Sequence, residues 1–209
     1  MDFSVTDLII DTNNVHLLEH LTILPELEVL YCWDNNLPYL DVGNCKNLKE
    51  LYCCDNSLKQ LDVSGCKNLE ILWCQNNKLE FLNVVGLKSL KQLWCCQNKL
   101  STLDLSGCES LEKIWCGENL ISEINLNVCP NLKTFSCCNG VLTRVIADNC
   151  TQLKNYGCFD NKLTTLDLTI NQLKNIRRLG ISYNPIRLDK NQQLYLDTTT
   201  FKPEFRIKV

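Results

Sequence analysis

Cysteine is the residue type whose abundance and spacing most invite a chemical interpretation. The chain contains 15 cysteines in 209 residues, and most of them recur with a period of 21 residues. So many thiols would suit a disulfide framework, a metal centre or an activated nucleophile. Two periodic files hold most of them: Cys32, Cys53, Cys74, Cys95, Cys116, Cys137 and Cys158 in the first, and Cys45, Cys66, Cys108, Cys129 and Cys150 in the second.

The spacing of the cysteines argues against metal binding. No two of them have the two-residue separation typical of zinc sites, and the only histidines, His16 and His20, lie near the N-terminus. No oxygen-rich loop of the calcium-binding type occurs either. We therefore expect neither a metal nor another cofactor.

The remaining cysteines, Cys54, Cys96 and Cys138, each follow a member of the first file in alternate repeats. We expect them to be exposed packing residues about 10 Å apart, too far for a disulfide. Cys96, near Trp94 and Gln97, is the best candidate for a reactive thiol, but it has no evident cationic neighbour to lower its pKa. Nucleophile-elbow and phosphate-loop motifs are absent, so the sequence predicts no enzyme.

Composition excludes several other classes. An apolar fraction of 45% with 22% charged residues is typical of a chain with a real core, and a net charge of -3 gives no reason to expect nucleic-acid binding. No apolar run is long enough for membrane insertion, and the acidic N-terminus does not resemble a signal peptide. An odd number of thiols favours a reducing compartment, so we expect a cytoplasmic protein or one delivered to a host cytosol.

Repetition explains where the cysteines fall. Successive coils resemble LKELYCCDNSLKQLDVSGCKN at residues 48–68, and their first positions are Leu27, Leu48, Leu69, Leu90, Leu111, Leu132 and Leu153. A 22-residue coil from Val5 precedes them and a 23-residue spacing leads on to Ile176, which makes nine coils. One coil cannot bury its own apolar side chains, so positions 1, 4, 6, 11, 14, 16 and 19 should point into a shared core. The two cysteine files, at positions 6 and 19, are then small core residues.

Side-chain alternation predicts the local structure of each coil. Position 5 must face outward because it lies between inward positions 4 and 6, so parallel strands are expected at positions 3–5. A second short extended run is expected at positions 13–15, and helices are not needed.

The pattern resembles the leucine-rich-repeat signature, in which Leu, Leu, an apolar residue, Asn and Leu stand at positions 1, 4, 6, 9 and 11. Cysteine at position 6 and the LDVS half-repeat resemble the nested bacterial subclass called IRREKO. The resemblance covers residues 5–188 and implies a solenoid of stacked 21-residue coils with a parallel sheet on one face. Similar bacterial repeats occur in surface proteins and in effectors delivered to host cells, which implies a host partner. Some relatives carry a ubiquitin-ligase domain, and no such domain is expected within these 209 residues.

Three segments are predicted. Residues 1–26 would form an N-terminal cap and first atypical coil, 27–188 the solenoid, and 189–209 a C-terminal cap or the start of a following segment. A short helix is an alternative for the first segment, since Leu17, Leu18, Leu21 and Leu24 have helical spacing. In the last segment, strand-like alternation is expected for Leu194, Leu196, Phe201, Phe205 and Ile207.

Asparagine at position 9 is expected to satisfy backbone groups at a turn. It recurs in seven coils, as Asn35, Asn56, Asn77, Asn98, Asn119, Asn161 and Asn184. Gly140 interrupts this file, which predicts a weak point in its coil.

Aromatic side chains at position 5 are the main candidates for function. Tyr31, Tyr52, Trp73, Trp94 and Trp115 are consecutive, and then Ser136, Gly157 and Gly180 end the series. Stacking between neighbouring strands and recognition of a partner explain the series equally well and are compatible. Trp33 and Phe159, at position 7, would widen the surface at its ends.

Position 8 carries acidic or amide side chains throughout, including Asp34, Asp55 and Glu118. A partner bearing Arg or Lys would complement this column above an aromatic floor, although a merely solvated turn explains it as well.

These features predict a non-enzymatic protein–protein interaction module, which is expected to be a monomer. The predicted partner site is Tyr31, Tyr52, Trp73, Trp94, Trp115, Trp33, Asp34, Asp55, Glu118 and Phe159. Carbohydrate binding through the same rings and a structural spacer are the alternatives.

Overall fold

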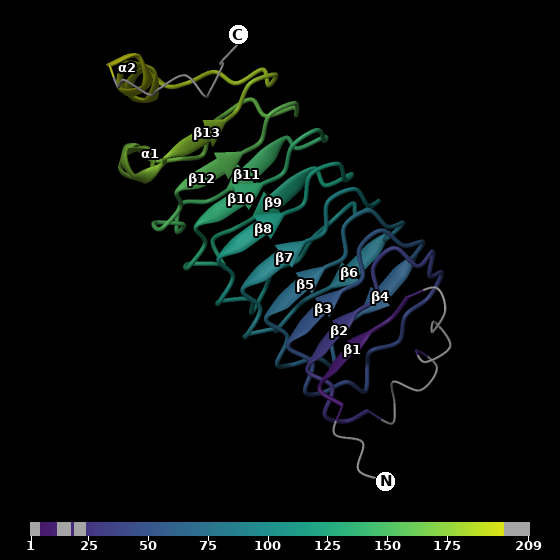
Figure 1. Cartoon of the computed structure of the whole chain (residues 1–209). Helices are drawn as coiled ribbons and strands as arrows, with labels where there is room; N and C mark the ends of the chain where they lie inside the picture. The colour runs from purple at the N-terminus through teal and green to yellow at the C-terminus, as the bar shows by residue number, and fades with distance from the viewer. Residues whose placement is uncertain (1–4, 12–17, 19–23, 199–209) are drawn as a thin grey trace.

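The computed structural model describes residues 5–11, 18 and 24–198. Over these residues the chain winds into an elongated stack of coils, with two short helices at the C-terminal end (Figure 1).

One parallel sheet runs along the whole stack. Its nine strands pair in the order β1-β2-β3-β5-β7-β8-β10-β12-β13, so eight turns of chain separate the first from the last in the described part. The strands are β1 (Asp7–Ile9), β2 (Val29–Tyr31), β3 (Glu50–Tyr52), β5 (Ile71–Trp73), β7 (Gln92–Trp94), β8 (Lys113–Trp115), β10 (Thr134–Ser136), β12 (Asn155–Gly157) and β13 (Arg178–Gly180). Each occupies positions 3–5 of its coil, which confirms the prediction.

On the second face, strands at positions 13–15 form two separate two-stranded sheets. There β4 (Gln60–Asp62) pairs with β6 (Phe81–Asn83), and β9 (Glu123–Asn125) pairs with β11 (Arg144–Ile146). The predicted second extended run is therefore confirmed in these four coils.

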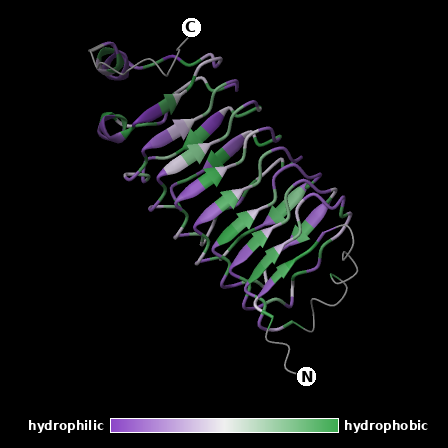
Figure 2. Cartoon of the chain, viewed as in Figure 1, coloured by the Kyte–Doolittle hydropathy of each residue, from purple (hydrophilic) through white to green (hydrophobic). Residues whose placement is uncertain are grey.

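The core lies between the two faces, at the predicted inward positions. In the coil at residues 48–68 these positions are at most 3% exposed: Leu48, Leu51, Cys53, Leu58, Leu61, Val63 and Cys66. Figure 2 shows the resulting alternation of apolar and polar residues along each coil. Because every coil buries its apolar side chains against the next, stability comes from neighbouring coils.

The core cysteines do more than fill space. The Sγ atoms of Cys66 and Cys108, at position 19, donate to the carbonyl oxygens of Val42 and Val84 in the preceding coils, at 3.4 and 3.0 Å. A thiol is small enough for this column and also satisfies a buried carbonyl there.

The asparagines at position 9, which we call the Asn ladder, join successive coils. Asn98 Nδ2 donates to the carbonyl oxygens of Cys74, Cys95 and Cys96 at 3.0–3.1 Å. Its Oδ1 accepts from the Leu79 N–H at 2.9 Å. The ladder is structural, as predicted, because it pairs backbone groups that the turn leaves buried.

Gly140 has no side chain to continue the Asn ladder, and a thiol makes part of the missing contact. Asn119 Nδ2 donates to the Cys95 carbonyl oxygen of the coil before it. At the next step Cys137 Sγ donates to the Cys116 carbonyl oxygen at 3.5 Å. The break in the ladder is therefore partly compensated.

One helix lies within the repeats, in the arc of the coil that begins at Leu153, so the expectation that the coils need no helices is wrong there. Helix α1 (Ile170–Asn175) follows Thr169, which forms a capping box with Gln172. The side chain of Gln172 also donates to the Ala147 carbonyl oxygen at 2.6 Å, which fixes α1 to the preceding coil. This short helix accommodates the two extra residues of the coil from Leu153, which is 23 residues long.

Helix α2 (Lys190–Thr198) corrects one prediction. Leu194 and Leu196 were expected to alternate as in a strand, but both lie in α2. Asp189 Oδ1 accepts from the N–H groups of Asn191 and Gln192 at 2.8 Å and so begins the helix. Phe201, Phe205 and Ile207 lie outside the described residues, as do Leu17 and Leu21 of the alternative N-terminal helix.

Candidate interaction surface

The sheet brings the five aromatic side chains at position 5 together as one continuous file, which we call the aromatic row. Ring centroids are 4.8 Å apart for Tyr31 and Tyr52, and 5.0 Å for Tyr52 and Trp73. Trp73 and Trp94 stack at 4.4 Å, and Trp94 and Trp115 lie at 4.5 Å. The rings were expected to be exposed, but each is half-buried because its neighbours cover its faces.

Several polar atoms beside the aromatic row have no hydrogen-bond partner in the described part of the chain. They are the indole Nε1 of Trp73, the indole Nε1 of Trp94 and Oε1 of Gln75, all of them buried. Buried indole N–H groups usually find an acceptor, so the row carries unused hydrogen-bonding capacity.

Two further aromatic rings lie at position 7, near the ends of the aromatic row. Trp33 is 45% exposed and meets Tyr31 edge-on, with a centroid distance of 5.3 Å. Phe159 is 40% exposed and lies two coils beyond Trp115. Trp33 therefore adjoins the N-terminal end of the aromatic row, whereas Phe159 is separated from Trp115 by the coil that contains Ser136.

Position 8 has a backbone reason for its acidic and amide side chains. Asp34, Asp55 and Glu118 have φ values of 55°, 56° and 54°, and Asn76 and Gln97 also lie in the left-handed region. Asp and Asn tolerate this conformation better than other side chains with a Cβ. The column is thus explained in part by the turn, and its side chains remain exposed.

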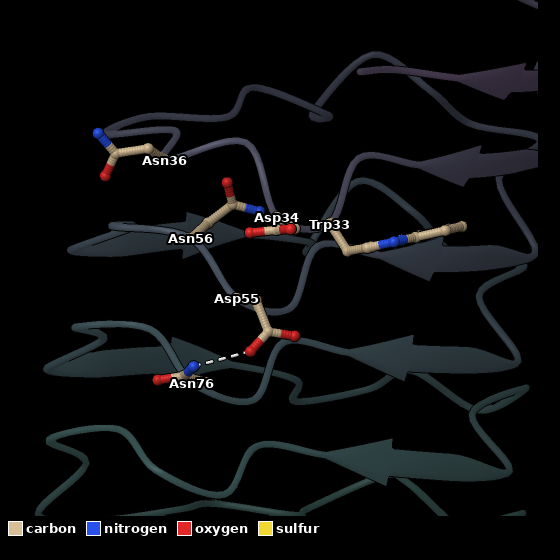
Figure 3. A pocket seen from close by; sticks show the side chains of 6 residues that line it. All are labelled: Trp33, Asp34, Asn36, Asp55, Asn56 and Asn76. Carbon is tan, nitrogen blue, oxygen red and sulfur yellow. Dashed lines mark hydrogen bonds between the residues drawn. The ribbon is translucent and has the colours of Figure 1, made fainter. Parts of the chain in front are cut away.

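The N-terminal end of this column borders a polar pocket of about 530 Å³. Trp33, Asp34, Asn36, Asp55, Asn56 and Asn76 line it. Figure 3 shows that these side chains come from the turns of successive coils, with Asp55 accepting from Asn76 Nδ2 at 2.7 Å. Two exposed carboxylates beside an exposed indole would suit a cationic side chain.

The three cysteines at position 7 are less accessible than predicted. Cys54 is only 8% exposed, so its expected exposure is wrong, and Cys96 and Cys138 are half-buried. Burial raises the pKa of Cys54 to about 12 and that of Cys96 to about 11. Thiols with such pKa values are protonated at neutral pH, which argues against Cys96 as a nucleophile.

The surface that continues the aromatic row toward the C-terminus was not predicted from the sequence. A groove of about 540 Å³ lies over β8, β10, β12 and β13. We call it the C-terminal groove; its lining includes Lys113, Trp115, Ser136, Gly157, Phe159, Arg178 and Gly180. The signal in the sequence was the change from rings to small residues at position 5.

Neither a metal-binding cluster nor a membrane-spanning helix occurs among the described residues. These residues contain no cluster of three or more His, Cys, Asp or Glu side chains arranged to hold a metal ion. None of the helices described here is long and apolar enough to cross a membrane.

Sequence comparison identifies the repeat. The family described as leucine-rich repeats in two copies matches residues 46–88. No curated protein sequence matches the chain.

Solved structures share the fold at low sequence identity. The functional domain of InlJ from Listeria monocytogenes, described as including a cysteine ladder, has 24% identity and a TM-score of 0.64, covering 87% of this chain and 42% of that one. An internalin, InlF, from Listeria monocytogenes has 21% identity and a TM-score of 0.71, covering 84% and 60%. The leucine-rich-repeat part of FLRT2, solved in an octameric complex with Latrophilin 3 and Unc5D, has 20% identity and a TM-score of 0.63, covering 82% and 59%.

This chain therefore spans about half the length of those solved chains. The 21-residue period and the burial at each coil position show a solenoid fold of the leucine-rich-repeat type, and residues 46–88 match the leucine-rich-repeat family itself.

Proposed function

We propose that this chain is a non-enzymatic interaction module that holds a protein partner on its strand face, centred on the aromatic row. The observation that carries the proposal is an uninterrupted series of five half-buried rings along the middle of a nine-stranded sheet. Trp and Tyr supply much of the binding energy in protein interfaces, and contiguous apolar surface usually marks a binding site.

Order within the aromatic row favours binding. Each ring is held by its neighbours at centroid distances of 4.4–5.0 Å, so the free protein already has a fixed surface. A fixed surface loses little side-chain entropy when a partner binds.

The polar pocket at Trp33, Asp34 and Asp55 gives the surface a second feature. Its carboxylates would attract Arg or Lys side chains of the same partner and orient them over the indole. Glu118 continues the acidic column further along the sheet.

Ring geometry favours a protein partner over a carbohydrate. Sugars stack on the open faces of aromatic rings, whereas Trp73 and Trp94 stack on each other with an interplanar angle of 15°. What these rings present outward is mainly their edges.

The comparisons support an interaction role in general terms, since the leucine-rich-repeat part of FLRT2, which shares this fold, was solved in a complex with other proteins. The nested cysteine-containing subclass, a bacterial source and a host partner are further parts of the proposal, suggested by the resemblance. A likeness of fold alone does not identify a partner.

The test is to remove rings from the middle of the aromatic row. In the double variant Trp73→Thr and Trp94→Thr, threonine keeps the preference for strand structure while removing the aromatic surface. Partner capture by the immobilised variant would be compared with capture by the unaltered chain, after circular dichroism has verified folding.

A matched control removes exposed rings elsewhere. Tyr39 and Phe81 are 67% and 63% exposed and lie outside the aromatic row. We expect the Trp73→Thr and Trp94→Thr variant to lose a specific partner and the Tyr39→Thr and Phe81→Thr variant to keep it. Full retention by a folded Trp73→Thr and Trp94→Thr variant would assign binding to another surface.

A further inference from the structure

The C-terminal groove begins where the aromatic row ends. Its floor is formed by the position-5 residues Ser136, Gly157 and Gly180, on three adjacent strands. Trp115 closes it toward the aromatic row, and Phe159 stands on the side of position 7. The groove is thus an apolar trough on the same face of the sheet as the aromatic row.

The glycines on the floor of the groove are not required by the backbone. A Cβ at Gly157 would lie 3.4 Å from Ser136 Oγ, and one at Gly180 would lie 3.7 Å from Gly157 Cα, which are ordinary contacts. Gly117 is different, because a Cβ there would come within 2.6 Å of the Cys138 carbonyl oxygen. Glycine inside a strand weakens it and often marks a place where a ligand approaches closely. The fold would accept larger side chains in this groove, yet the position is left open.

Cations line the edge of the groove where its strands begin. Lys113 and Arg178 both line the groove, at position 3 of their coils. The ion pairs of the described chain join Lys49 to Glu28, Lys91 to Glu70 and Lys133 to Glu112, so neither groove cation is engaged by a carboxylate there. Lys154 and Arg177, at position 2, lie beside them without an ion pair of their own.

We propose that the C-terminal groove binds an acidic peptide segment of the partner protein, with one apolar side chain held between Trp115 and Phe159 and carboxylates held by Lys113 and Arg178. The proposal rests on the proposed function, because the groove continues the same face. The apolar floor takes the side chain, and the unpaired cations supply charge complementarity for the residues that flank it.

The strand spacing sets the length of the peptide. Lys113 and Arg178 stand three strands apart in the order β8-β10-β12-β13. Adjacent strands are about 4.8 Å apart, so the two cations are separated by roughly 14 Å, which an extended peptide spans in about four residues. Two acidic residues four apart, with the apolar residue between them, fit this distance.

The opposite edge of the groove fixes the orientation of the peptide. Glu118 and Asp160 lie at position 8, where the strands end, and both are exposed. Their carboxylates repel an acidic ligand, which directs the acidic groups of the peptide toward Lys113 and Arg178.

Synthetic peptides test the proposal directly. The probe is the acetylated, amidated pentapeptide Glu-Gly-Phe-Gly-Glu, and the comparison peptide carries Gln in place of both Glu residues. Titration calorimetry and NMR shifts of the Trp115 indole would follow binding to the full chain. We expect saturable binding of the acidic peptide, at least tenfold tighter than that of the Gln peptide.

Two variants locate the site. Gly157→Trp fills the groove, and the double change Lys113→Glu and Arg178→Glu reverses the lining charge. Each should weaken the acidic peptide at least tenfold. A matched control, Lys67→Glu and Lys88→Glu, makes the same change in net charge at exposed residues outside the groove and should leave binding unaltered.

Three results would overturn the inference: no saturable binding of the acidic peptide, equal binding of the Gln peptide, or unchanged binding to Gly157→Trp. Tighter binding of an acidic oligosaccharide, oligogalacturonate, would assign the groove to sugars instead. These outcomes are distinct from failure of the proposed function, which is tested at Trp73 and Trp94 outside the groove. A partner that is lost with those tryptophans but kept by Gly157→Trp would leave the interaction role standing and remove only the groove from it.

Discussion

At the scale of single residues, two adjacent side chains in each turn have opposite roles. Asn98 is buried and pairs backbone groups of two coils through four hydrogen bonds. Gln97, one residue earlier, is exposed and has a φ of 53°. Hydrogen bonding explains why Asn98 is an asparagine, whereas the positive φ largely explains the residue type at Gln97.

Asn98→Ala should destabilise the solenoid by about 1–3 kcal/mol, because it leaves the Leu79 N–H and several carbonyl oxygens buried without partners. Urea unfolding measures this loss. The control Gln97→Ala changes an exposed side chain and should stay within about 0.5 kcal/mol of the unaltered chain. Equal effects of the two substitutions would contradict a structural role for the Asn ladder.

Gln97→Val should destabilise the chain by about 1–2 kcal/mol, since a β-branched residue is strained at positive φ. Gln97→Gly relieves that strain and should be neutral or stabilising. Thermal unfolding of the two variants decides the matter, and a Val variant as stable as the Gly variant would show that the turn does not restrict position 8.

At the scale of elements, the strands can be predicted from the sequence because apolar residues recur at positions 4 and 6 of every coil, on either side of the outward position 5. Alternation around Leu51, Leu72 and Leu93 placed each strand at positions 3–5, and the same logic placed β4 and β6. At Leu194 and Leu196 the alternation predicted a strand wrongly, because Asp189 caps the N-terminus of a helix there.

Ion pairs at position 2 were not predicted from the sequence, although their residue types alternate between successive coils. Glu28 pairs with Lys49, Glu70 with Lys91, and Glu112 with Lys133, at 2.6–2.9 Å. The pairs are half-exposed, so each adds little stability. Their alternation matches that of Cys54, Cys96 and Cys138 and indicates a 42-residue unit of two coils.

Two glycines, Gly157 in β12 and Gly117 after the end of β8, give predictions of opposite sign. Gly157→Ala should stabilise the chain by up to about 1 kcal/mol, because alanine fits and reduces the freedom of the unfolded chain. Gly117→Ala should destabilise it, because the new Cβ would meet the Cys138 carbonyl oxygen. Urea unfolding of both variants is the measurement, and destabilisation by Gly157→Ala would mean that the fold itself requires that glycine.

At the scale of the whole molecule, the buried thiols link stability to pH. Burial raises the pKa of Cys66 and Cys129 from 9.0 to about 12, and that of Cys108 to about 11. Above pH 9 the unfolded chain loses these protons while the folded chain retains them. Stability should then fall with rising pH, by about 1.4 kcal/mol per pH unit for each such thiol.

We therefore expect cooperative unfolding between about pH 9 and pH 11, followed by circular dichroism with reductant present. Cys129→Leu provides a control, since Leu87 occupies the same coil position. This variant should unfold at a higher pH than the unaltered chain. Equal stability at pH 7 and pH 11 would contradict the burial of the thiols.

The fold could be predicted almost entirely from the sequence, whereas the surface could only be predicted in part. Periodicity determines which positions of a coil face inward, and a solenoid has few other choices. The half-burial of Trp73 and Trp94 depends on contacts between neighbouring rings, and the C-terminal groove depends on what Gly157 and Gly180 lack. An absence of side chains carries little signal until strand pairing places those glycines beside Trp115 and Phe159.

Hydroxyl-radical footprinting of the chain with and without its bound partner tests the central claim most directly. It reports the accessibility of individual aromatic side chains on both faces of the solenoid at once. The account predicts that a partner protects Trp73, Trp94 and Trp115 on the strand face and leaves Tyr39 and Phe81 unchanged. Protection of Tyr39 and Phe81 with none at Trp115 would contradict recognition through the strand face.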